Sequence, residues 1–202
     1  MITRDQILVV AATERELAIP DGWRTLRCGV GPVDAAAATA AAIAGDRPAL
    51  ILHVGIAGAR RRAELKPPTL VIGSASLYSD LRVPEVWSPR SIAAPQTLIA
   101  AAERALPAAV IRRIATSGRV AGGGGGGGGE SGDDDGWCDV EAMEGFGVLR
   151  AAQLAGVPAL EVRAISNDVE EPDRAKWQFD AAFRAITIAT PLVVAECLTC
   201  KP

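Results

Sequence analysis

The sequence predicts an α/β fold of three layers, with a mixed, mostly parallel central sheet flanked by helices. Short apolar runs rich in β-branched residues alternate with segments of helical composition, and this alternation is typical of such sheets. A chain of 202 residues with 49% hydrophobic residues can build one sizeable core, and nothing in it demands a second domain. We therefore expect a single domain over residues 1–202.

The expected elements follow one another along the chain. Strands are predicted at residues 7–12, 50–54, 69–72, 110–115 and 160–165. Helices are predicted at residues 35–44, 97–106, 145–155 and 177–198. The first helix is almost pure alanine, the best helix former, and the second and third repeat apolar residues at spacings of three and four. Pro191 is expected to kink or interrupt the last helix.

One segment, at about residues 122–136, breaks the alternation. Gly122 to Gly129 are eight consecutive glycines, and a glycine- and aspartate-rich stretch follows them. Neither part can bury enough apolar surface to become ordered. We expect a flexible, solvated linker, with a mobile lid over a pocket as the alternative.

Charge and composition exclude several classes of partner. A net charge of -3 and a pI near 5.3 give no basic field for nucleic acid or an acidic membrane surface, so a small-molecule ligand fits better. No apolar run is long enough to span a bilayer, and the start of the chain lacks the pattern of a secretory signal. The sequence therefore predicts a soluble, cytoplasmic protein.

The four cysteines are too few and too scattered for a disulfide framework, so reduced thiols are expected. Cys197 and Cys200 have the spacing of a redox or zinc motif, but this pair follows a long helical pattern rather than a strand. A zinc site would need two more ligands, and His53, the only histidine, lies inside a predicted strand. We expect no metal and no cofactor, and no role for these thiols.

Polar residues gather at both ends of one helix-strand unit in residues 140–168. Glu141 and Glu144 stand at a predicted helix start, and Ser166, Asn167 and Asp168 follow a buried strand. Ligands of open α/β sheets bind where strands end and helices begin, so both clusters indicate a single pocket. Capping of the helix and turns is the alternative role for these residues.

A third acidic cluster follows the first predicted strand. Thr13 can cap a helix, and the negative charges of Glu14 and Glu16 would then be favourable at the positive end of that helix. Alternatively, one of these glutamates is a general base, because a carboxylate shielded from water has a raised pKa.

Two glycine-containing segments, residues 29–32 and 55–58, could bring backbone close to a ligand. The first also suits a plain helix start, with Pro32 in the first turn, and the second could simply pack against a neighbouring helix. Neither matches a Walker motif or a dinucleotide-binding fingerprint.

Taken together, six segments resemble, in order, the purine nucleosidases and phosphorylases of the type that includes methylthioadenosine/adenosylhomocysteine nucleosidase. They are ATEREL (12–17), GVGPVDAA (29–36), GIAG (55–58), TSGR (116–119), MEG (143–145) and RAISN (163–167). Within that group, EAMEGF (141–146), ISN (165–167) and DRAKW (173–177) are similar to the futalosine hydrolases of menaquinone biosynthesis.

The resemblance implies cleavage of an N-glycosidic bond, whose transition state has oxocarbenium character. Glu16 falls on the position of the family's water-activating carboxylate. Glu144, with the backbone around Met143, falls on the position that binds the ribose hydroxyls. The remaining substrate contacts are placed at Ala57, Gly58 and Ser166, and aromatic stacking at Phe146, Trp177 or Phe179.

The resemblance also implies which base leaves. Adenine-releasing members place an aspartate directly after the serine, where this chain has Asn167. An amide cannot donate a proton as an acid, but it can hydrogen-bond a 6-oxopurine such as hypoxanthine, the base of futalosine. Asp168 is the alternative, since a slip of one residue would restore an acid and predict release of adenine.

Hydrolysis is favoured over phosphorolysis. Arg60, Arg61 and Arg62 could be proposed to bind phosphate, but consecutive residues cannot all point inward, and Glu16 would repel the anion. A phosphorylase, and a nucleoside-binding protein without turnover, remain the alternatives. The family further implies a homodimer or larger homo-oligomer.

Overall fold

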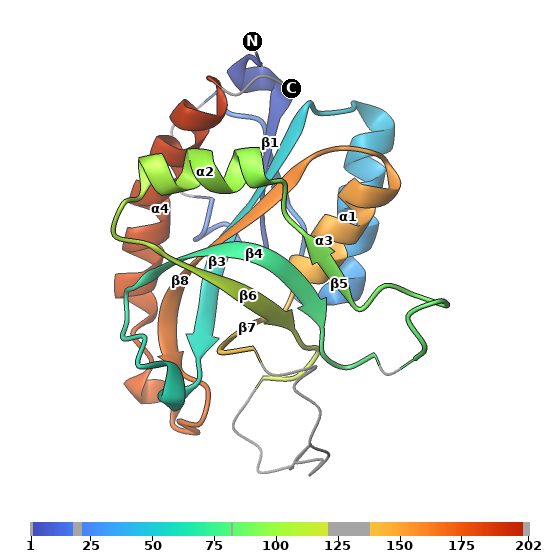
Figure 1. Ribbon diagram of the computed structural model, residues 1–202. Coiled ribbons are helices and arrows are strands. Elements are labelled where there is room, and N and C mark those ends of the chain that lie inside the picture. Colours follow the sequence, from blue (N-terminus) through green and yellow to red (C-terminus); the bar gives the residue numbers. More distant parts are fainter. Residues whose placement is uncertain (1, 18–21, 82, 121–137, 200–202) are drawn as a thin grey trace.

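The computed structural model describes residues 2–17, 22–81, 83–120 and 138–199, and it has a central sheet with helices on both faces (Figure 1). This confirms the predicted three-layer α/β fold. The glycine- and aspartate-rich segment at residues 122–136, predicted to be flexible, and Cys200 lie outside the described residues.

Over the described residues the sheet has eight strands, of which β8 (Ala159–Asp168) pairs with both β3 (Leu50–Ala59) and β4 (Leu70–Tyr78). The other strands are β1 (Ile7–Ala11), β2 (Thr25–Arg27), β5 (Ser91–Ala93), β6 (Val110–Thr116) and β7 (Val140–Ala142). Their order is β2-β1-β3-β7-β6-β4-β5. Five pairings are parallel, whereas β3 with β7, β4 with β5 and β4 with β8 are antiparallel. The pairings of β3, β8, β4, β6 and β7 close into a ring.

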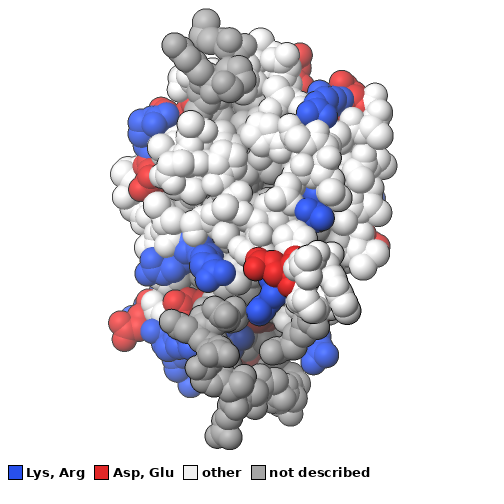
Figure 2. Space-filling view, turned by 45° about the vertical axis from the view of Figure 1, so that its right-hand side comes forward, with Lys and Arg blue, Asp and Glu red and all other residues white. Residues whose placement is uncertain are grey.

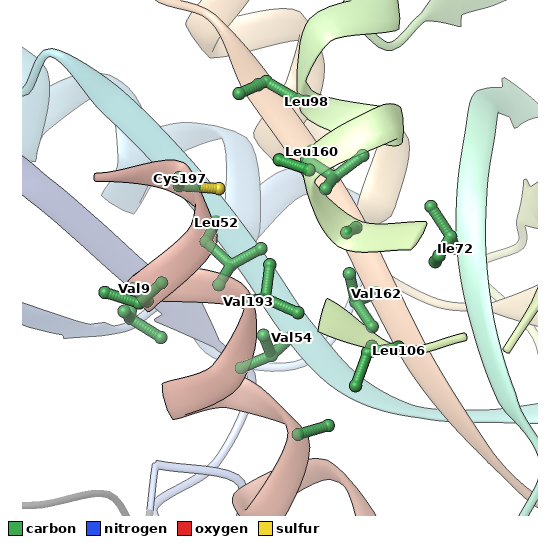
Figure 3. Packing of buried hydrophobic residues seen from close by; sticks show 14 of the residues in the cluster. Val9, Leu52, Val54, Ile72, Leu98, Leu106, Leu160, Val162, Val193 and Cys197 are labelled. Atoms are coloured by element: carbon green, nitrogen blue, oxygen red, sulfur yellow. The ribbon is translucent and has the colours of Figure 1, made fainter. Parts of the chain in front are cut away.

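In the part of the chain that the structure describes, four α-helices form the outer layers (Figure 1). Helices α2 (Gln96–Ala105) and α4 (Phe179–Cys197) pack together on one face, where Val193 and Cys197 meet Leu52 and Leu160 of the sheet (Figure 3). Helices α1 (Pro32–Gly45) and α3 (Gly145–Leu154) pack together on the other face. Three short 3₁₀ helices lie at Arg4–Gln6, Arg61–Ala63 and Arg174–Lys176. Among the described residues, none of the helices has the length and apolar character to cross a membrane.

The five predicted strands are all present, but four of them, β3, β4, β6 and β8, are longer than predicted. β3 runs through the glycine-containing segment 55–58, which therefore lies within a strand and not after it. Small residues remain compatible with an extended strand, so they did not end it. The short strands β2, β5 and β7 were not predicted, because three residues carry too little periodicity. Helix α4 continues through Pro191, so the prediction of an interruption was wrong, while a kink stays a prediction.

The ends of these elements converge on one region. The chain after β1 makes turns at residues 12–17 and forms no helix there, so the predicted helix capped by Thr13 is absent. At its start, α1 has Gly31 at φ 96° as N-cap and Pro32 as first residue, as predicted. Glu144 is the N-cap of α3, immediately after β7. This region, at the ends of β1, β3, β7 and β8, holds the candidate site.

Candidate functional site

A cavity of about 300 Å³ opens at the ends of these strands, a size within the usual range for small-molecule sites. Eight of the residues predicted from the sequence line it: Glu16, Ala57, Gly58, Met143, Glu144, Ser166, Asn167 and Trp177. They come from five separate segments of the chain, so the fold brings together what the sequence keeps apart.

Glu16 is buried, and its carboxylate is fixed by three hydrogen bonds. Oε2 accepts from the backbone N–H of Thr13 at 2.9 Å and from the Thr13 hydroxyl at 2.7 Å. Oε1 accepts from the backbone N–H of Ile56 on β3 at 3.2 Å. Burial raises the pKa of Glu16, with repulsion from Glu144 in the same direction, while Arg163 and the hydrogen bonds oppose the rise. A carboxylate with a raised pKa in a cavity can act as a general base.

Glu144 is the second buried carboxylate of the cavity, with only 4% of its surface exposed. As the N-cap of α3 it lies at the positive end of that helix. Its Oε1 accepts from the backbone N–H of Gly31 at 3.3 Å, and its Oε2 accepts from Nη2 of Arg163 at 3.3 Å. An ionised carboxylate held in this way can accept hydrogen bonds from ligand hydroxyls.

Ser166 and Asn167 lie at the end of β8. The Ser166 hydroxyl is 3.1 Å from the carbonyl oxygen of Ala57 and 2.7 Å from Oδ1 of Asn167. Nδ2 of Asn167 donates to the carbonyl oxygen of Asp168 at 3.0 Å, which fixes the orientation of the amide. Among the described residues Nδ2 makes this one hydrogen bond as a donor, so the second hydrogen of the amide can serve a ligand.

Asp168, the predicted alternative acid, does not line the cavity. Its carboxylate accepts from Nε of Arg61 at 2.8 Å and from the backbone N–H of Glu170 at 2.8 Å. Hydrogen bonds with Glu170 and Arg61 hold the pKa of Asp168 below its ordinary value. The hypothesis that placed Asp168 in the site is corrected, because these contacts hold its carboxylate outside the cavity that Asn167 lines.

The aromatic wall differs from the prediction in two residues, Phe146 and Phe183. Phe146 packs between α1 and α3 against Tyr78, with ring centroids 5.2 Å apart, and does not line the cavity. It follows Glu144 by two positions on α3, so its side chain turns toward the helix layer instead of the cavity. Trp177 and Phe179 do line the cavity, 5.5 Å apart, together with Phe183, which the sequence analysis missed.

With this geometry described, the chain can be compared with known proteins. The family model described as the phosphorylase superfamily matches residues 25–198. The chain belongs to the phosphorylase superfamily. A superfamily relative from Streptomyces coelicolor, named futalosine hydrolase, is 34% identical over 186 residues, which are 85% of this chain and 78% of that protein.

Solved structures of the superfamily share the fold. The futalosine hydrolase of Helicobacter pylori strain 26695 has a TM-score of 0.78 at 17% identity, covering 96% of this chain and 97% of that chain. The S-adenosylhomocysteine nucleosidase of Streptococcus pyogenes, in complex with 5-methylthiotubericidin, has a TM-score of 0.77 at 19% identity, covering 96% and 97%. These likenesses support the fold assignment of this superfamily member.

The three consecutive arginines of this superfamily member are each paired with carboxylates. Arg60 pairs with Glu141 and Glu170, Arg61 with Asp168, and Arg62 with Asp139. Among the described residues that line the cavity, the one cation is Arg119. No cluster of cations faces the cavity within the part of the chain that the structure describes, and no group there of three or more His, Cys, Asp and Glu residues could hold a metal.

Sequence reasoning missed the buried charges beneath the cavity. Arg163 is fully buried and contacts Glu144, Glu161 and His53. The signal was present, because Glu161 and Arg163 are two opposite charges at positions i and i+2 of an otherwise apolar strand. Such residues face the same side of a strand, and a charge inside a buried strand needs a partner.

Proposed function

We propose that this protein hydrolyses the N-glycosidic bond of a 6-oxopurine nucleoside, with futalosine as the substrate and hypoxanthine as the released base. The observation that carries the proposal is that Glu16 and Glu144, two buried carboxylates, line one cavity together with Asn167. The 34% identity to a protein named futalosine hydrolase supports the choice of nucleoside, and with it a place in menaquinone biosynthesis.

In this proposal Glu16 activates the attacking water. Its three hydrogen bonds hold the carboxylate in one orientation, and its raised pKa makes it a stronger base than an exposed glutamate. The carboxylate takes a proton from water as the oxygen bonds to the anomeric carbon, and the bond from that carbon to the purine nitrogen breaks.

Glu144 binds the ribose hydroxyls and stabilises the positive charge that develops on the sugar. Its two oxygens already accept from Gly31 and Arg163, and each oxygen has further lone-pair capacity for an O–H donor. Charge stabilisation of this kind is strong in a site that excludes water.

Asn167 binds the leaving base. The free hydrogen on Nδ2 can donate to O6 or N7 of a 6-oxopurine. An amide does not supply a proton, so the purine leaves as its anion with the bonding electron pair and takes its proton from solvent, and this suits hypoxanthine better than adenine. Trp177, Phe179 and Phe183 provide the apolar wall for the purine or its sugar substituent.

Water is the proposed nucleophile in place of phosphate. A phosphate beside the anomeric carbon would lie near Glu16 and Glu144, and the arginines at 60–62 are engaged by carboxylates elsewhere. The charge distribution supports a small-molecule ligand over a polyanion, since Figure 2 shows small charged groups of both signs separated by wide uncharged areas.

The experiment is an assay of purine release from futalosine, inosine and methylthioadenosine, each with and without phosphate. The proposal expects hypoxanthine release that does not depend on phosphate. Release of adenine from methylthioadenosine as the main activity would refute the choice of base, and dependence on phosphate would refute hydrolysis. Binding of hypoxanthine without turnover of any nucleoside would indicate a binding protein.

We also infer that the protein is cytoplasmic and forms a homodimer or larger assembly. Val33, Val86 and Trp87 expose 75, 88 and 77% of their surfaces, and large exposed apolar side chains are typical of interfaces. Val33 also borders an apolar groove formed by α1, α3 and Tyr78.

A further inference from the structure

Beneath the cavity lies a second group of ionisable side chains, which we call the buried charge cluster: His53, Glu161 and Arg163. All three are at most 1% exposed. Glu161 and Arg163 are two residues apart on β8, and His53 lies on the neighbouring strand β3, paired in register with Glu161. None of the three lines the cavity.

Arg163 is held by contacts at each of its three nitrogens. Nε donates to Oε1 of Glu161 at 2.8 Å, and Nη1 donates to the carbonyl oxygen of Ile56 at 3.4 Å. Nη2 lies 2.5 Å from Nε2 of His53 and donates to Oε2 of Glu144 at 3.3 Å. The guanidinium therefore connects the cluster with Glu144, a carboxylate of the cavity.

The tautomer of His53 follows from these contacts. Its Nδ1 lies 3.0 Å from the carbonyl oxygen of Val10, which can only accept, so Nδ1 carries the hydrogen. Nε2 is then the acceptor for Arg163. Burial and the neighbouring guanidinium both lower the pKa of His53, so it stays neutral and serves as a fixed acceptor.

The surrounding backbone is shaped to admit the cluster. A Cβ atom on Gly55 would lie 2.3 Å from Nη1 of Arg163 and 2.8 Å from Oε1 of Glu16. A Cβ atom on Gly145, at the start of α3, would lie 2.2 Å from Oε2 of Glu161. Glycine at these two positions lets the Glu161 carboxylate reach the start of α3 and lets Arg163 approach Glu16.

The charges of the cluster do not balance those of the cavity. One guanidinium serves three buried carboxylates, those of Glu16, Glu144 and Glu161. Glu161 lies closer to Arg163, at 2.8 Å, than Glu144 does, at 3.3 Å, so it offsets the positive charge that reaches the carboxylates of the cavity. Burial raises the pKa of Glu161, and the guanidinium of Arg163, in contact with it at 2.8 Å, opposes this rise.

We propose that Glu161 is a positioning residue of the site: with neutral His53 it fixes the Arg163 guanidinium against Glu144 and limits the positive charge felt by Glu16. The inference rests on the proposed function, because it assigns Glu16 as the base. Buried ion pairs contribute little net stability, so stability alone is a weak reason for this arrangement, whereas a fixed guanidinium next to both carboxylates of the cavity affects their chemistry directly.

The proposal predicts a change in the titration of Glu16. The charged and titratable groups that face Glu16 are Arg163 from β8, Glu144 at the start of α3, and Cys28 after β2. The thiol of Cys28 has its pKa raised to about 12, by burial first, and it stays uncharged. With the charge of Glu161 removed, the positive charge of Arg163 is less offset and stabilises ionised Glu16, so the pKa of Glu16 falls.

The test compares Glu161→Gln with the wild type and with Glu196→Gln. Glu196 pairs with Arg104 at an exposed site on α4, so this control removes a charge of the same sign away from the cavity. For Glu161→Gln we expect kcat for hypoxanthine release to fall at least about tenfold, and the acid limb of the pH–rate profile to move to lower pH. The control should stay within about twofold, with an unmoved profile. A folded Glu161→Gln protein with unchanged kcat and an unmoved acid limb overturns the proposal.

Loss of one partner of a buried pair can prevent folding, so Glu161→Asp is the second variant. It keeps the charge but shortens the side chain, and should lower kcat without moving the acid limb. Full activity of Glu161→Asp would overturn the positioning role.

Titration of the Glu16 carboxyl by ¹³C NMR, assigned with Glu16→Gln, gives a readout without turnover. If the wild-type protein releases no purine, the proposed function fails. A Glu16 titration that still moves to lower pH in Glu161→Gln supports the inference independently, and one that does not move refutes it.

Discussion

The substitution Gly55→Ala tests the site with a single methyl group. The added carbon would lie 2.3 Å from Nη1 of Arg163 and 2.8 Å from Oε1 of Glu16. Carbon and polar atoms pack at about 3.5 Å, so the end of Arg163 must retreat by about 1 Å and Glu16 by somewhat less. Neither side chain is free to move, because Glu161 and His53 hold Arg163, and Thr13 holds Glu16.

The expected effect on activity exceeds the effect on stability. A displacement of about 1 Å in a catalytic group costs about 10²-fold in rate. Overpacking a buried position by one methyl group costs about 1–3 kcal/mol of unfolding free energy. We therefore expect Gly55→Ala to fold with a lowered Tm and to retain about 1% of wild-type kcat.

The assay measures hypoxanthine release by its absorbance after oxidation, beside thermal unfolding followed by circular dichroism. Gly45→Ala is the matched control, since a Cβ atom on Gly45 meets no atom within 4 Å and the residue lies at the end of α1. It should keep full activity and gain up to about 1 kcal/mol of stability. Gly55→Ala activity within twofold of wild type would refute the close approach of Arg163 and Glu16.

Three further predictions concern single residues of the site and surface. Asn167→Asp should raise the ratio of adenine release to hypoxanthine release at least about tenfold, whereas Asp168→Asn should leave this ratio unchanged. If both variants change the ratio equally, the assignment of Asn167 is contradicted. Glu16→Gln should lower kcat at least about 10²-fold while hypoxanthine binding persists in calorimetry. Because the folded-state pKa of Glu16 is raised, its stabilising contribution is present below its unfolded pKa and is lost as pH rises through the folded value. Glu16→Gln should therefore have a higher Tm than wild type at pH 8, with the difference shrinking toward pH 4, and a lower Tm at pH 8 would be inconsistent with a buried base. Trp87→Ser should weaken self-association in light scattering at micromolar concentration, and an unchanged mass at every concentration would place the interface elsewhere.

Most of the sheet could be predicted because its strands are buried on both faces. The runs at β1, β3 and β8 are apolar and rich in β-branched residues, and such runs are typical of strands that are buried on both faces. The short strands β2, β5 and β7 could not be predicted, because their partners, and not their own residues, make them strands.

Most of the candidate site could also be predicted, through the resemblance of short segments to a family. Glu16, Glu144 and Asn167 were named in this way, and the structure places all three around one cavity. Phe146 was misplaced, because the direction of a side chain at a helix start depends on how that helix meets the sheet. For Asp168, the strand register decided the outcome, because the pairing of β3 with β8 shifts by one residue between Ala57 and Gly58, just before Asn167 and Asp168.

By itself the sequence determined the alternation of strands and helices, the segments that carry polar groups and the absence of a basic field for polyanions. These are properties of local composition and spacing, which do not depend on contacts with distant parts of the chain. Only the tertiary structure decided that the end of β8 turns Asn167 into the cavity and Asp168 toward Arg61, and that Arg163 lies between Glu144, Glu161 and His53. The physical reason is that these contacts join residues up to 110 positions apart, and their geometry depends on how β3, β8 and α3 pack together.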